Sequence, residues 1–177
     1  MTSGRPEFVV QHHLATADHY DVRLEIEGVL VSWALPKGPS TDPRVRRMAI
    51  RTDDHELAHA GVEGAFGRSA VLVWDRGTFD HQGEGDAAAG LAAGHLSVWL
   101  DGEKLHGGYT FLRLPGEPKE TWLMIKKRDG EADPVDDPVA TRPESVLTGR
   151  TLEQITAEQL EPHPTHEGER HGSRSER

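Results

Sequence analysis

Hydrophobic and polar residues alternate one by one along several stretches of the chain. The clearest stretch is 19–28, HYDVRLEIEG, in which Tyr20, Val22, Leu24 and Ile26 are separated by polar or charged residues. Such period-two alternation is typical of a β-strand with one face in a core. The sequence therefore predicts a half-buried strand here, and its second face carries a histidine, an aspartate and an arginine in succession.

Other segments also predict strands, because they are rich in β-branched and aromatic residues and are bounded by glycine-containing turns. Many short strands at this spacing indicate a β-barrel or a β-sandwich. Loops are expected at 36–43 and 53–64, and the alanine-rich segment 86–94 is the best helix candidate in the middle of the chain. The further strands are expected at 8–13, 29–35, 46–52, 69–79, 95–102, 103–114 and 121–130.

The C-terminal part of the chain has a different composition. Residues 129–143 are acidic and proline-rich, which is typical of a linker. The segment 151–160 begins with Thr151 and Gln154 in a capping-box arrangement that predicts a short helix, and 161–177 has few apolar side chains. We expect one globular domain over 1–133, a linker and short helix packing on or trailing it over 134–160, and a flexible, disordered tail over 161–177.

The composition narrows the classes of function. The chain has no cysteine, which excludes disulfides and thiolate metal sites. No apolar run approaches the ~18 residues of a membrane-spanning helix, so we expect a soluble, cytoplasmic protein without a membrane partner. The net charge of −10 argues against general coating of nucleic acid. A local positive pocket remains compatible with that charge, and a cluster of arginines could supply it: Arg44, Arg46, Arg47 and Arg51.

The polar face of the 19–28 strand could form a metal site. Residues i and i+2 of a strand lie on one face, roughly 6–7 Å apart, so His19 and Asp21 could approach one ion. A third ligand could come from His12 or His13 on the preceding predicted strand. Two histidines and a carboxylate suit manganese, iron or zinc and leave positions open for water or substrate. Arg23 cannot ligate a cation, but its guanidinium group matches a pair of phosphate oxygens, which indicates phosphoryl transfer or hydrolysis.

A simpler explanation exists for each of these residues. Polar side chains at alternate strand positions usually face water, and a His-x-Asp-x-Arg pattern alone is a weak signal. His55 and His59 are four residues apart and would share one face of a helix, but histidines in such a segment are more often surface residues of a loop. Lys37 lies in a proline–glycine turn, where exposure to solvent is expected.

Longer stretches of the sequence resemble a known family. FVVQHHLATADHYDVRLEIEGVLVSWALPKGPSTDP, RRMAIRTDDHELAHAGVEG and VLVWDRGTF occur here in that order. Together they resemble the 3′-phosphoesterase module of bacterial ligase D, a DNA ligase of non-homologous end joining. LHGGYTFLRL and WLMIKKRDGEADP extend the resemblance, which runs from about Phe8 to Asp133. No polymerase or ligase domain accompanies these motifs, so we expect a stand-alone member with its phosphoesterase domain over 1–133.

The resemblance implies a mainly β fold, a compact β-barrel with a polar cavity, and few short helices. It implies a divalent metal, most typically Mn²⁺, with Zn²⁺ or Co²⁺ as alternatives. Where the family usually has a tyrosine, this chain has His59, which can donate a hydrogen bond but titrates near neutral pH. The implied metal ligands are His13, His19 and Asp21; the implied catalytic residues are Arg23, His55, His59, Lys37 and Arg47; Arg23, His55 and Gln11 are the implied phosphate-binding residues, with Asp53 in support.

The resemblance also implies a substrate and partners. The expected activity removes 3′-terminal ribonucleosides and 3′-phosphates from DNA ends or primer–templates and leaves a 3′-hydroxyl for ligation. The expected partners are a separately encoded ligase, polymerase or end-binding protein, and the chain itself is expected to be a monomer. Two alternatives remain open: a non-catalytic DNA-end binding module of the same fold, and an unrelated cupin-like metalloenzyme.

Overall fold

The structure, a computed structural model, describes residues 4–160. The predicted tail over 161–177 lies outside the described residues. The described part is mainly β, as predicted, with three short α-helices and one 3₁₀ helix, η1. The strands are β1 (Glu7–Leu14), β2 (Asp18–Ile26), β3 (Val29–Leu35), β4 (Arg46–His55), β5 (Gly64–Phe66), β6 (Ser69–His81), β7 (His95–Gly102), β8 (His106–Arg113) and β9 (Thr121–Lys126). The helices are η1 (Leu57–Gly61), α1 (Ala87–Ala93), α2 (Pro138–Thr141) and α3 (Leu152–Leu160).

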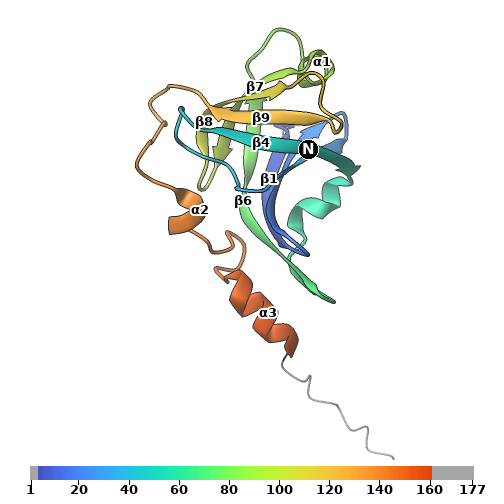
Figure 1. Cartoon of the computed structure of the whole chain (residues 1–177), viewed down its shortest axis with the longest axis vertical. Helices are drawn as coiled ribbons and strands as arrows, with labels where there is room; N and C mark the ends of the chain where they lie inside the picture. Colours follow the sequence, from blue (N-terminus) through green and yellow to red (C-terminus); the bar gives the residue numbers. More distant parts are fainter. Residues whose placement is uncertain (1–3, 161–177) are drawn as a thin grey trace, which may run out of the picture.

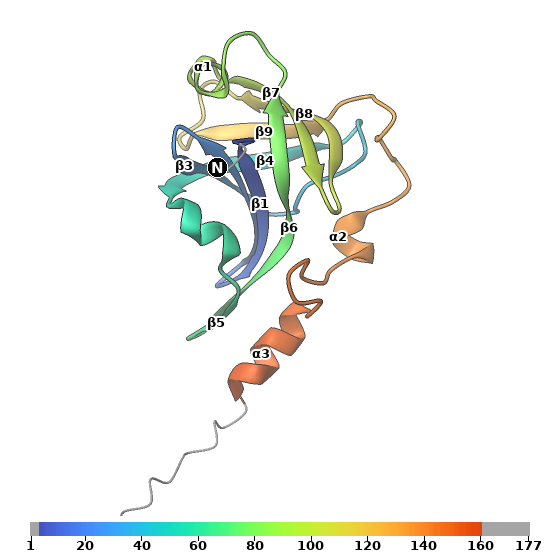
Figure 2. The same ribbon diagram turned by 180° about the vertical axis from the view of Figure 1, so that it is seen from behind.

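Eight of these strands close into an antiparallel barrel. The hydrogen-bonded order is β1-β2-β3-β4-β9-β8-β7-β6, and β6 pairs back onto β1. The short strand β5 adds to the N-terminal end of β6, which makes a hairpin that projects beyond the ring (Figures 1 and 2). Closure leaves the eight strands without an open edge, and it confirms the barrel expected from the resemblance.

The inside of the barrel is filled with apolar side chains. Tyr20, Val22, Leu24 and Ile26, the alternate residues of β2, all belong to this core. The largest fully buried side chains are three of the tryptophans: Trp33, Trp74 and Trp122. Because successive residues of a strand point to opposite faces, the polar residues of β2 must lie on the outer face of the barrel wall. The fold therefore places the polar face of the 19–28 strand on the outer side of the barrel wall, away from its core.

The predicted helices are present, and one predicted loop is wrong. The Asp86 side chain accepts a hydrogen bond from the backbone N–H of Ala89 at the start of α1, and Gly94 ends the helix with φ 77°. Thr151 and Gln154 form the predicted reciprocal capping bonds before α3. The segment predicted as a loop over 53–64 instead contains the end of β4, η1 and the start of β5. Short elements of this kind carry too few residues to show a hydrophobic period.

The segment after residue 133 packs on the barrel. The backbone N–H of Val146 donates to the carbonyl of Val73 at 2.9 Å, and the Trp74 indole N–H donates to the carbonyl of Arg142 at 2.8 Å. Leu152 and Ile155 of α3 are buried with the core residues. In Figures 1 and 2, α2 and α3 lie outside the ring of strands, and α3 contacts β5 and β6. None of the helices over 4–160 combines the length and the apolar character that crossing a membrane would need.

Glu63 joins this C-terminal segment to the barrel. Its carboxylate accepts hydrogen bonds from the Val73 N–H at 2.9 Å and the Thr148 hydroxyl at 2.7 Å, and Arg150 lies 3.3 Å away. Burial alone would raise the pKa of Glu63, but the hydrogen bonds from Ser145, Thr148 and Val73 outweigh it and lower the pKa. A carboxyl group with a lowered folded-state pKa stabilises the fold above its ordinary pKa of 4.5, and this contribution is lost as the pH falls further.

We therefore expect Glu63→Gln to loosen the segment around α3 and to lower the free energy of unfolding by about 1 kcal/mol at pH 7. Because the pKa is lowered, the difference between wild type and variant should shrink as the pH falls below about 4.5. Hydrogen exchange of residues 143–158 at pH 7 and urea unfolding between pH 3 and pH 7 measure the two effects. The exposed Glu56→Gln change is the matched control, and an equal effect of both variants would contradict the assignment.

Candidate metal and phosphate site

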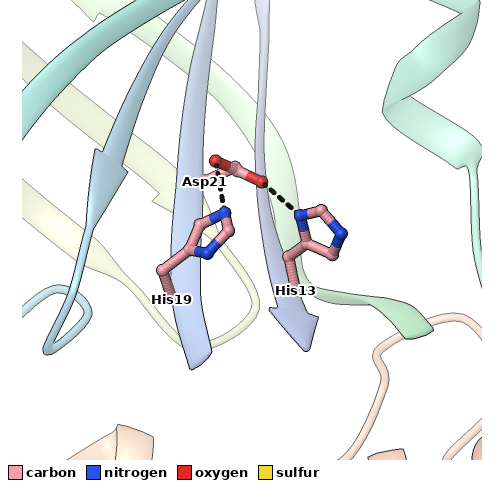
Figure 3. Close-up of side chains that lie close together, drawn as sticks. All are labelled: His13, His19 and Asp21. Carbon is pink, nitrogen blue, oxygen red and sulfur yellow. Dashed lines mark ion pairs between the residues drawn. The ribbon is translucent and has the colours of Figure 1, made fainter. Parts of the chain in front are cut away.

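Strand pairing brings the three predicted metal ligands together. In the register of β1 and β2, His13 lies directly opposite His19, and Asp21 follows two residues later on the same face. One ligand atom from each of the three residues lies within 4.8 Å of the others. Figure 3 shows both imidazole rings turned toward the Asp21 carboxylate, with His13 Nδ1 at 3.6 Å and His19 Nε2 at 3.3 Å from its oxygens. The donor set, two imidazoles and a nearly buried carboxylate, fits a divalent cation.

His12 points to the opposite face of β1. Its ring stacks on Tyr20 with centroids 4.1 Å apart, and its Nε2 pairs with the Asp18 carboxylate. The neighbouring His13 ring is instead 4.8 Å from the His19 ring. Of the two histidines that the strand pattern left open, only His13 is placed to share an ion with His19 and Asp21.

The charges around the carboxylate shift several pKa values. The hydrogen bond with Asp21 raises the pKa of His19, whereas burial, helped by the positive charge of His19, lowers the pKa of His13. Burial alone would raise the pKa of Asp21, but the hydrogen bond with His19 and the charge of Arg23 outweigh it and lower the pKa. Asp21 is therefore ionised near neutral pH, which is the state that a metal ligand requires.

Arg23 lies beside the carboxylate and is held in place by its neighbours. Its Nη2 is 3.4 Å from Asp21 Oδ2, its Nε donates to Gln11 Oε1 at 2.7 Å, and its Nη1 donates to the Ser32 hydroxyl at 2.9 Å. The side chain is only 5% exposed. A guanidinium group fixed by this many bonds is oriented before any substrate arrives, which suits the recognition of an oxyanion.

Gln11 positions Arg23 and does not line the pocket. Besides accepting from Arg23, its side-chain amide donates to the carbonyls of His59 at 2.8 Å and Val62 at 3.2 Å. Gln11 is completely buried. It therefore ties η1 and the residue that follows it to the barrel wall and fixes the guanidinium group at the same time. Its expected direct contact with phosphate stays a prediction, and the geometry favours an indirect role.

We expect Gln11→Ala to lower the free energy of unfolding by about 1–3 kcal/mol, because it leaves buried polar partners without hydrogen bonds. Urea unfolding monitored by tryptophan fluorescence measures this loss. The exposed Gln82→Ala change removes the same functional group from the surface and should have little effect. Equal stability of the two variants would show that Gln11 does not hold these elements together.

A bulge brings His55 and Thr52 to the same side of the sheet. Leu30 pairs with His55 and Ser32 pairs with Thr52, so a step of two residues along β3 corresponds to a step of three residues along β4. Without the shift, residues 52 and 55 would point to opposite faces. His55 Nδ1 lies 3.0 Å from Arg23 Nη1 and 2.9 Å from the carbonyl of Asp53, so its partner depends on the tautomer.

His59, at η1, stands next to His55. The ring centroids are 4.6 Å apart. Burial, with the positive charge of Arg23, lowers the pKa of His59. The ring is therefore mostly neutral at pH 7 and can donate or accept one proton.

A single pocket of about 510 Å³ collects these groups. Lys37 is exposed in the turn after β3, and neither it nor Arg47 lines the pocket. The Asp53 side chain is exposed, and only the backbone carbonyl of this residue lies near His55 Nδ1, at 2.9 Å. Roles for these three residues stay predictions. The lining residues are His13, His19, Asp21, Arg23, Thr52, His55, His59, Val62, Phe66 and Val71.

Four of these lining residues were not anticipated from the sequence. Thr52 precedes His55 by three positions, and only the bulge aligns the two. Val62, Phe66 and Val71 carry no catalytic group. Only Val71 lies in a predicted strand, 69–79, whereas Val62 lies in the predicted loop over 53–64 and Phe66 lies in no predicted element.

Three candidate metal ligands and a pre-oriented arginine in one pocket on a β-barrel suit the binding and hydrolysis of a phosphate ester. The model of the DNA ligase D 3′-phosphoesterase domain matches residues 11–113, more than half of the chain. The chain belongs to this family.

Full-length relatives carry the same domain. Over 159 residues the chain is 44% identical to the multifunctional non-homologous end joining protein LigD of Pseudomonas aeruginosa, covering 85% of this chain and 19% of that protein. The LigD DNA repair protein of Mycobacterium tuberculosis is 41% identical over 73% of this chain and 17% of its own length. LigD of Mycolicibacterium smegmatis is 31% identical over 72% of this chain and 18% of its own length. The chain thus spans about a fifth of the length of these relatives.

Proposed function

We propose that this protein is a metal-dependent phosphoesterase that processes DNA 3′ ends, removing 3′-terminal ribonucleosides and 3′-phosphates to leave a 3′-hydroxyl. The observation that carries the proposal is the close grouping of His13, His19 and Asp21 beside the guanidinium group of Arg23. Membership of the ligase D phosphoesterase family supports the choice of a DNA end as substrate. Mn²⁺ is the proposed ion, with Zn²⁺ and Co²⁺ as alternatives.

The three ligands would hold the ion, which when bound supplies positive charge for a phosphate oxygen and lowers the pKa of bound water. Arg23 donates from its guanidinium group to a non-bridging phosphate oxygen and stabilises the charge that grows there during displacement. Gln11 and Ser32 keep that group from turning away. Because these bonds already orient the guanidinium group, Arg23 can donate to a phosphate oxygen without changing its conformation.

His55 is the proposed proton donor to the leaving oxygen. To act as the acid, His55 carries a proton on both ring nitrogens: the Nδ1–H donates to the carbonyl of Asp53, and the Nε2–H is transferred to the leaving oxygen, which leaves a neutral imidazole. A positioned acid of this kind contributes about 10²–10⁴ in rate. His59, whose pKa is lowered, assists as a neutral hydrogen-bond donor. Lys37 and Arg47 would act through longer-range positive potential, since neither lines the pocket.

The proposed substrate also sets the proposed context. DNA ends and primer–templates with a 3′-ribonucleotide or a 3′-phosphate would reach the pocket in the cytoplasm, and the chain would act as a monomer. The product, a 3′-hydroxyl end, is the substrate that a ligase or polymerase needs. A separately encoded ligase, polymerase or end-binding protein is therefore the proposed partner.

The test is a product assay with defined DNA primers ending in a 3′-ribonucleotide or a 3′-phosphate, incubated with Mn²⁺, Zn²⁺, Co²⁺ or a chelator. We expect stepwise conversion to a 3′-hydroxyl end with Mn²⁺ and none with the chelator. Absence of product with every metal would overturn the catalytic proposal. Tight binding of the same ends without product would instead favour the end-binding module.

A further inference from the structure

One wall of the pocket is apolar, although phosphate chemistry needs no apolar wall. Val62, Phe66 and Val71 line the pocket together with the charged and polar groups. Phe66 is 54% exposed, and among the large apolar side chains over 4–160 only Val135 is more exposed. A large aromatic surface left open beside a phosphate site matches a substrate that carries a flat ring next to its phosphate.

The sheet register fixes where this aromatic ring lies. Gly64 pairs with Val71, and Val71 pairs with His13, so these three residues point to the same side of neighbouring strands. Phe66 is two residues from Gly64 in β5 and therefore shares this face. Two strand spacings, about 10 Å, separate β5 from β1 and its metal-site histidine. A nucleoside attached to a phosphate at the metal site can span this distance.

Gly64 makes room for the ring. A Cβ atom added at Gly64 would lie 3.4 Å from Phe66 Cζ, so the ring lies over the glycine rather than pointing away from the sheet. Gly64 also has φ 149°, a conformation that other residues rarely adopt. The ring is thus held across the sheet face, with its other side open to solvent.

We propose that Phe66 is a stacking platform for the terminal nucleoside of a DNA 3′ end, so that it determines the preference for ends in which a nucleoside follows the scissile phosphate. The inference rests on the proposed function and adds to it a subsite for the base. Stacking on one aromatic face tolerates every base, because each base presents a similar flat surface. Phe66 offers no ligand atom to a metal, so it acts on substrate affinity.

The experiment compares Phe66→Ala with wild type on two matched primers, one ending in a 3′-ribonucleotide and one in a bare 3′-phosphate. For the nucleoside-bearing end, Phe66→Ala should raise KM and the Kd from fluorescence anisotropy roughly tenfold, with little change in kcat. For the 3′-phosphate end both constants should stay within about twofold, because no base follows the phosphate. Phe66→Trp should restore tight binding of the nucleoside-bearing end.

Leu112→Ala is the matched control, since Leu112 is a large apolar residue that is 40% exposed on β8, outside the pocket. Leu112→Ala should leave KM and Kd unchanged for both primers. If Phe66→Ala weakens the binding of both ends equally, or changes the binding of neither, the stacking proposal is wrong even if the enzyme is active. If wild type turns over neither end, but Phe66→Ala still weakens binding of the nucleoside-bearing end alone, the proposed function is wrong and the nucleoside subsite is supported.

Discussion

The His13→Ala variant is expected to lose divalent-metal binding, whereas His12→Ala, one residue away, is expected to keep it. His13 Nδ1 faces the Asp21 carboxylate at 3.6 Å, but the His12 ring lies against Tyr20 on the other face of the strand. Removing a group that only supports a ligand costs 10–100-fold in affinity, so removing a ligand itself should weaken Mn²⁺ binding by more than about 100-fold. Isothermal titration calorimetry with MnCl₂ and electron paramagnetic resonance of bound Mn²⁺ measure the difference.

Phosphoesterase activity should follow metal binding in this pair. We expect no product from His13→Ala at any tested Mn²⁺ concentration that supports wild type, and near wild-type activity from His12→Ala. The two variants remove the same side chain from adjacent positions of β1, so a general loss of structure cannot explain a difference. If His12→Ala lost the metal and His13→Ala retained it, the assigned metal site would be wrong.

The second large effect is expected at Arg23. Arg23→Ala should lower kcat for phosphate release by about 10²–10³, because one fixed donor to the developing negative charge is lost. It should also lower the stability of the metal-free protein by about 3–5 kcal/mol, since Asp21, Gln11 and Ser32, all buried, lose the guanidinium group at the same time. Metal binding should persist, because no ligand atom is removed. Single-turnover kinetics, calorimetric Mn²⁺ titration and urea unfolding separate the three effects.

Arg23→Lys is the conservative variant that keeps this test decisive if the alanine variant unfolds. Lysine retains the charge beside Asp21, so most of the stability should return. It cannot donate to Gln11, Ser32 and a phosphate oxygen with one planar fork, so activity should remain low. Full activity of Arg23→Lys would mean that positive charge alone suffices, and the proposed geometry of the guanidinium group would be wrong.

Much of the fold follows from local patterns. The alternation in 19–28 identifies β2 and separates its core face from its polar face, because side chains of a strand alternate whatever the partner strands are. The capping residues Thr151 and Gln154 act within a few residues of the start of α3, so the sequence also shows them. The segment 53–64 was predicted as a loop because three short elements there leave no period to detect.

The sequence alone determined the strand that carries His19, Asp21 and Arg23, and its motifs indicated the family. The tertiary structure decided which side chains meet across strands. It placed His13, which the resemblance had already implied, opposite His19, moved His55 onto the face of Thr52 through a bulge, and laid Phe66 over Gly64 at the edge of the same pocket. The physical reason is that alternation along one strand is local, whereas register between strands is set by pairing of residues far apart in the chain.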